Sequence, residues 1–83
     1  MSSQSSIAEA LACLQAGDWE GAHALVAADP SAEAAWLHAH LHRVEGDHSN
    51  AQYWYARAGR VAPTVTLAEE RQALLSALTK TAA

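Results

Sequence analysis

Four breaker segments constrain this 83-residue chain more than any other feature, because they cut it into stretches of helical length. Alanine occupies 21 positions and phenylalanine none, and no stretch alternates apolar and polar residues as a half-buried strand does. A chain this short has room for a single domain. The sequence therefore predicts one all-α domain of about five helices. The breakers are Gly17-Asp18, Asp29-Pro30-Ser31, Gly46-Asp47 and Ala62-Pro63-Thr64.

The breakers also predict how the single domain, residues 1–83, is divided. Residues 1–5 are expected to be disordered, residues 6–30 to form a first antiparallel helical hairpin, and residues 31–63 to form a second. Residues 64–83 are expected to form a capping helix with a frayed end. Two hairpins bury their apolar faces only on each other, so this helix is expected to dock as a cap over the open end.

Each helix after the first has a candidate N-cap, a side chain that accepts hydrogen bonds from the free amides of the first turn. Asp18 and Asp47 follow the two glycines, Asp29 or Ser31 precedes the third helix, and Thr66 with Glu69 has the spacing of a capping box. Apolar residues then recur three and four positions apart, which predicts one buried face per helix. The expected faces include Ile7, Leu11 and Leu14; Trp19, Ala22, Leu25 and Val26; Ala34, Leu37, Leu41 and Val44; Ala51, Trp54, Tyr55, Ala58 and Val61; and Leu67, Leu74, Leu75 and Leu78.

Several polar and aromatic side chains are expected on particular faces of these helices. We expect Trp19 to pack on His23, and Tyr53 to point outward beside Arg57, because each pair is four residues apart. In the last helix the leucines are expected to face inward. Its polar residues Glu69, Glu70, Gln72 and Lys80 are expected to face largely outward.

Two parts of the chain resemble tetratricopeptide repeats. In the segment from Ala32 to Pro63 the resemblance lies in Gly46-Asp47, Ala51, Tyr55, Ala58 and Pro63, and in the earlier segment it lies in Gly17-Asp18-Trp19, Ala22, Val26 and Pro30. The chain departs from the family pattern where His38 and His42 replace the usual leucine and tyrosine. The stretch Trp36 to Gly59 is also loosely similar to small bacterial proteins of unknown function. The resemblance implies helical hairpins that bind a peptide or protein.

The same resemblance implies that the ligand-facing side of the second unit holds Glu33, Trp36, His40 and Arg43. The last three recur at spacings of four and three, so an aromatic plane, a titratable donor and a guanidinium share one stripe. Such a stripe is suited to a peptide carboxylate or aromatic side chain. We therefore expect a small non-catalytic module that binds a peptide, a protein partner or a second copy as a homodimer. The alternative is that these residues only pack helices.

A second set of residues suggests a different function, a histidine-based metal-binding or pH-responsive helical protein. His38 and His42 lie four residues apart on one helical face, Glu45 falls on the same side, and His40 points away. Two imidazoles and a carboxylate offer nitrogen and oxygen donors to zinc or another divalent ion. His23 and His48 are more distant candidates for a fourth ligand. The structural alternative is that His38 and His42 only pack and form hydrogen bonds.

Composition argues against several classes of function. Five lysines and arginines and a formal net charge of −4 disfavour nucleic-acid binding, which needs clustered cations. No segment reaches the roughly 20 apolar residues of a membrane span. The lone Cys13 and the lack of a secretory signal favour the cytoplasm. Because the chain has neither a phosphate-binding loop nor a nucleophile elbow, we expect no enzyme activity and no cofactor, apart from the divalent ion considered above.

Overall fold

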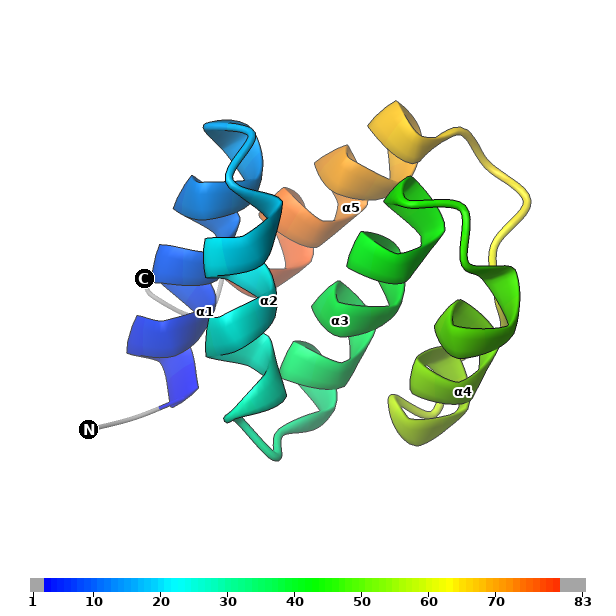
Figure 1. Ribbon diagram of the computed structural model, residues 1–83, viewed down its shortest axis with the longest axis horizontal. Coiled ribbons are helices and arrows are strands. Elements are labelled where there is room, and N and C mark those ends of the chain that lie inside the picture. Colours follow the sequence, from blue (N-terminus) through cyan, green and yellow to red (C-terminus); the bar gives the residue numbers. More distant parts are fainter. Residues whose placement is uncertain (1–2, 80–83) are drawn as a thin grey trace.

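The computed structural model describes residues 3–79, which form five helices (Figure 1). No strand occurs among these residues, so the prediction of an all-α fold with about five helices is confirmed. The helices are α1 (Ser3–Gln15), α2 (Trp19–Ala27), α3 (Ala32–Val44), α4 (His48–Arg57) and α5 (Leu67–Thr79).

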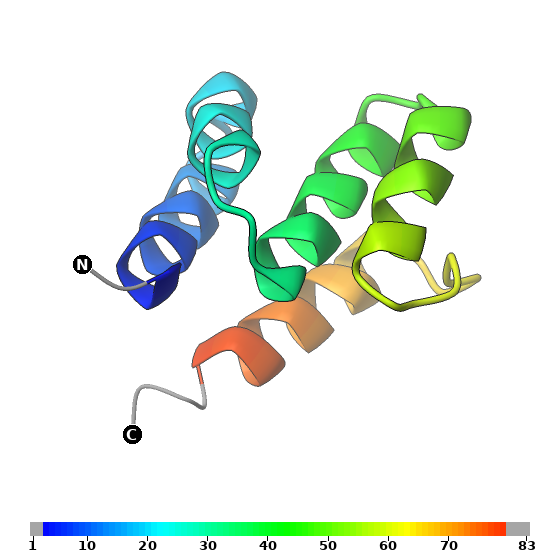
Figure 2. The same cartoon turned by 90° about the horizontal axis from the view of Figure 1, so that it is seen from below.

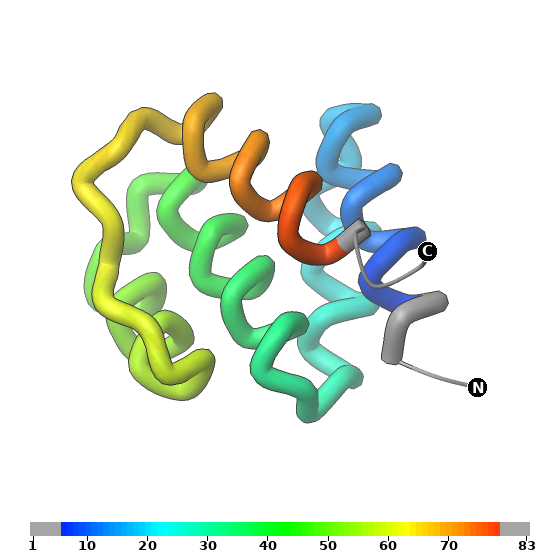
Figure 3. The backbone as a smooth tube through the Cα atoms, turned by 180° about the vertical axis from the view of Figure 1, so that it is seen from behind, coloured from blue at the N-terminus to red at the C-terminus, as the bar shows by residue number. Residues whose placement is uncertain are grey.

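The helices are arranged as a row of four with the fifth laid across one side. α1 packs against α2, α2 against α3, and α3 against α4. Helix α5 contacts both α3 and α1, and the view from below shows it crossing beneath these two helices (Figure 2). Seen from behind, α5 covers the face of α3 that is directed away from α2 (Figure 3). This docking of α5 determines which residues of α3 remain accessible.

The turns between helices follow the predicted cap chemistry. Gly17 and Gly46 have φ angles of 80° and 84°, which a residue with a side chain rarely adopts. The Asp18 carboxylate accepts from the Gly21 amide at 3.0 Å, and the Ser31 hydroxyl accepts from the Ala34 amide at 3.1 Å. Ser31 is therefore the N-cap of α3. Asp47 caps α4 through the Asn50 amide, and Thr66 and Glu69 form the predicted capping box.

Most residues of the predicted apolar faces are buried or partly buried, but two valines are exposed. Val44 is 41% exposed because it is the last residue of α3, and Val61 is 90% exposed because α4 ends at Arg57. The prediction that these two valines are buried is wrong. The large buried apolar and aromatic side chains are Ile7, Leu11, Val26, Trp36, Leu37, Leu41, Tyr55 and Leu74.

The ends of the chain differ in part from the sequence prediction. Helix α1 begins at Ser3, so residues 3–5 belong to a helix rather than to a disordered segment. Residues 1–2 and 80–83 lie outside the described part, and with them Lys80 and the expected frayed end. Within residues 3–79, every helix is too short or too polar to cross a membrane.

Candidate metal centre

Helix α3 presents histidines on two faces, and the face beneath α5 is a closed polar network around Glu70. This α5 carboxylate is only 2% exposed. Its Oε1 atom accepts from His40 Nδ1 at 2.7 Å and from Arg43 Nη1 at 2.9 Å. Its Oε2 atom accepts from Trp36 Nε1 at 3.1 Å and from the Tyr55 hydroxyl. Four donors from α3 and α4 therefore converge on one carboxylate.

This network corrects the predicted partner-binding stripe. Trp36 and His40 are 6% and 0% exposed, and Arg43 is half-buried, because α5 covers the face that was predicted to contact a ligand. The Arg60 guanidinium also lies over the Trp36 ring, 3.5 Å from its centroid. These residues therefore do not form an exposed stripe, and their burial agrees with the alternative that they pack helices.

The two glutamates assigned to surfaces have opposite outcomes. Glu33, the fourth residue assigned to the ligand-facing side, is exposed in the first turn of α3. Glu70, which was predicted to face outward, is buried. A carboxylate in the first turn of α5 is favourable for the helix dipole wherever it points. Its sequence position therefore carried no signal of burial.

The pKa of Glu70 agrees with an ionised carboxylate whose oxygens both accept hydrogen bonds. Burial alone would raise the pKa of Glu70, but hydrogen bonds from His40, Tyr55 and Arg43 outweigh burial and lower it to about 2. Burial and the hydrogen bond to this carboxylate raise the pKa of Tyr55 above its ordinary value. The charge of Glu70 is thus paired and its oxygens accept four hydrogen bonds, although His40 Nε2 is buried without a hydrogen-bond partner among the described residues. We interpret the network as structural.

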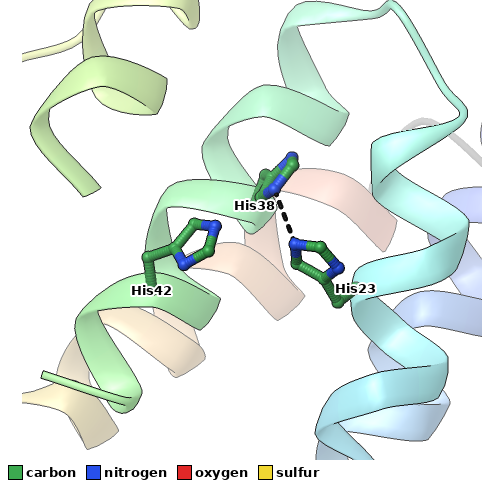
Figure 4. A group of neighbouring side chains, drawn as sticks. All are labelled: His23, His38 and His42. Carbon is green, nitrogen blue, oxygen red and sulfur yellow. Dashed lines mark hydrogen bonds between the residues drawn. The ribbon is translucent and has the colours of Figure 1, made fainter. Parts of the chain in front are cut away.

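The opposite face of α3 forms a different kind of cluster with α2. His38 and His42 of α3 converge with His23 of α2 (Figure 4). One nitrogen from each ring lies within 4.8 Å of the others. His38 and His42 are 4% and 6% exposed, and His23 is half-buried. Three imidazoles at this spacing form a candidate set of metal ligands.

The spacing between two of these rings is close to what a metal ion requires. The Nε2 atoms of His23 and His38 are 3.1 Å apart, at hydrogen-bond distance. Two nitrogens bound to one tetrahedral zinc ion at about 2.0–2.1 Å lie about 3.3–3.4 Å apart. An ion could therefore replace the shared proton with little movement of the rings. The His38 Nδ1 atom is buried without a hydrogen-bond partner among the described residues.

Two tryptophans pack against the three imidazoles. The Trp54 ring stacks on His38 with the centroids 3.9 Å apart, and Trp19 stacks on His23 at 4.7 Å, which confirms that predicted pair. The Trp19 indole also meets His42 edge-on and donates its N–H to the Leu41 carbonyl at 2.7 Å. These contacts restrict ring rotation. Tyr53 is exposed beside Arg57, as predicted.

The cluster keeps its central histidine unprotonated at neutral pH. Burial, together with the neighbouring His23 and His42, lowers the pKa of His38 to about 4. A metal ion binds the neutral imidazole, so it does not have to displace a proton from an imidazolium at this position.

Glu45 does not complete the ligand set in the way that the sequence suggested. Its Oε1 atom lies 2.6 Å from His42 Nδ1, so it accepts the proton of that nitrogen and leaves Nε2 for an ion. The predicted ligand set of His38, His42 and Glu45 is therefore replaced by His23, His38 and His42. His42 also lies near the carboxylates of Glu45 and Asp47, but both are exposed. His48 is exposed and belongs to neither group.

No family model, curated protein or solved structure matches this chain. The resemblance to tetratricopeptide repeats therefore stays a prediction from residues and spacing.

Proposed function

We propose that this chain is a metal-binding helical domain that holds one divalent transition-metal ion through His23, His38 and His42. The observation that supports it is the convergence of three imidazole nitrogens, from two helices, within 4.8 Å of one another. Two of the three rings are buried, and indoles pack on the cluster. Pre-oriented ligands of this kind lose little conformational freedom when an ion binds.

The donor atoms indicate which ions the site favours. Imidazole nitrogen is a good ligand for zinc, copper and nickel, whereas magnesium and calcium prefer oxygen. The protein thus binds Zn²⁺ and the other late first-row ions in preference to Mg²⁺.

Binding of a peptide, a protein or a second copy remains a prediction of the resemblance. The residues named for it, Trp36, His40 and Arg43, are committed to the Glu70 network. Geometry favours the metal-binding function over this alternative.

Titration calorimetry with Zn²⁺ after chelator treatment tests the proposal. We expect one ion per chain, with affinity at least tenfold lower in His23→Gln. This substitution is chosen because His23 is half-buried and is the ligand contributed by α2. His48→Gln is the matched control, since it removes an exposed histidine outside the cluster. A wild-type chain with no saturable zinc binding, or equal affinities in wild type and His23→Gln, would overturn the proposal.

A further inference from the structure

We propose that Glu45 is a positioning residue of this centre, which fixes the His42 ring so that its Nε2 atom faces the ion. This inference rests on the proposed metal-binding function. It assigns Glu45 a role through His42 and not as a ligand.

The position of Glu45 follows from the end of α3. Glu45 is the C-cap residue, and its backbone N–H donates to the Leu41 carbonyl at 3.2 Å. The cap holds the residue one turn beyond His42, from where its carboxylate reaches Nδ1 at 2.6 Å. The backbone at the end of the helix thus fixes the position from which the Glu45 side chain extends.

The contact determines which His42 nitrogen can bind an ion. An ionised carboxylate only accepts hydrogen bonds, so the proton of His42 lies on Nδ1 and the lone pair on Nε2. In Figure 4 one ring nitrogen of His42 is directed toward the other two imidazoles. A histidine ligand that donates its second N–H to a carboxylate is held in one orientation and is a stronger donor.

Charge adds to this orienting effect. Three neutral imidazoles leave the two positive charges of the ion uncompensated, and Glu45 places a negative charge directly behind one ligand. Loss of such an outer carboxylate typically weakens metal binding 10- to 100-fold. Glu45 is 43% exposed, so solvent screens part of its charge and we expect an effect of about tenfold.

A purely structural role would have a different signature. The His42–Glu45 contact is an i,i+3 pair at a half-exposed helix end, and such pairs contribute little to folding. We therefore expect Glu45→Ala to change the affinity for zinc while leaving the unfolding midpoint of the metal-free chain nearly unchanged.

The test compares Zn²⁺ affinity and metal-free unfolding in wild type, Glu45→Gln and Glu45→Ala. Affinity is expected to fall about tenfold in Glu45→Ala and by less in Glu45→Gln, whose amide oxygen still accepts a hydrogen bond. Glu33→Gln is the control, since it removes one exposed negative charge from the other end of α3. Unchanged affinity in Glu45→Ala, or an equal loss in Glu33→Gln, would overturn the positioning role. Failure of wild type to bind zinc would instead overturn the proposed function.

Discussion

The two histidine-bearing faces of α3 differ in the groups that their imidazoles face. Beneath α5, four donors meet the single Glu70 carboxylate, and a positive and a negative charge are paired. Beside α2, imidazole meets imidazole, and His23 and His38 share one hydrogen bond between two nitrogens that could each accept. On the first face the carboxylate oxygens are satisfied, and His40 Nε2 is buried without a hydrogen-bond partner among the described residues. On the second face, nitrogens of three imidazoles lie close to one another, where one ion can bind them together.

The comparison teaches that burial of histidine alone does not identify a site. His40 is the most buried histidine, at 0% exposed, yet it is bound to a carboxylate that stabilises the fold. His38 is also buried, at 4% exposed, but its neighbours are other imidazoles and an indole. The identity of the facing group separates a structural histidine from a candidate ligand.

The largest expected effect comes from breaking the Glu70 network. Glu70→Ala leaves the buried Trp36, His40 and Tyr55 donors unpaired and the Arg43 charge without its partner. Such losses cost about 3–5 kcal/mol of unfolding free energy, which urea denaturation would measure. Glu33→Ala, at an exposed helix terminus, should cost at most about 1 kcal/mol. Equal losses in the two variants would contradict the contrast between the faces.

Acid should protonate Glu70 and so weaken the same network. The folded-state pKa of Glu70 is about 2 and its ordinary value is 4.5, so between these values the unfolded chain binds a proton that the folded chain does not. The stability from Glu70 is therefore complete above about pH 4.5 and is lost as the pH falls toward 2. Carbon NMR of the Glu70 carboxyl should show a titration near pH 2. A titration midpoint near pH 4.5 would contradict a Glu70 carboxylate that is held ionised by its hydrogen bonds.

Zinc binding to His23, His38 and His42 should stabilise the folded chain by mass action. At a free ion concentration about 100 times the Kd, binding adds about 2.7 kcal/mol to the unfolding free energy. Urea denaturation with and without Zn²⁺ should show this gain in wild type and in His48→Gln. At the same zinc concentration, His23→Gln should gain much less. An identical gain in the His23 variant would place the binding elsewhere.

The smallest effect is expected from His23→Gln in metal-free protein. The substitution removes one stacked ring and one hydrogen bond at a half-buried position, and the new amide can still bond to His38. We expect a loss of about 1 kcal/mol by urea denaturation. A loss as large as that of Glu70→Ala would show that the cluster is as essential to folding as the closed network.

Local features of the fold could be predicted from the sequence because short-range chemistry decides them. Several of these features depend only on residues within one turn of the helix end: the glycine turns, the caps at Asp18 and Asp47, and the capping box at Thr66. The valine errors have local causes as well. Val44 and Val61 continue the apolar spacing of their helices. However, Val44 is the last residue of α3 and Val61 lies beyond the end of α4, so both are exposed.

The candidate site could be predicted only in part, because its members come from separate elements. His38 and His42 share a helical face, so their spacing alone pairs them. His23, which the sequence offers only as a more distant candidate, joins them because α2 packs against α3, a contact that spacing within its own segment does not determine. Glu70 was misplaced for the same reason, since the docking of α5 is a tertiary contact.

X-ray absorption at the zinc edge of the zinc-loaded chain tests the central claim most directly. Three imidazoles should contribute nitrogens at about 2.0–2.1 Å, with the outer scattering that is characteristic of histidine rings. The imidazole contribution should fall from three to two in His23→Gln and remain at three in His48→Gln. A zinc shell made of oxygens alone, or a histidine count that His23→Gln leaves unchanged, would contradict the account.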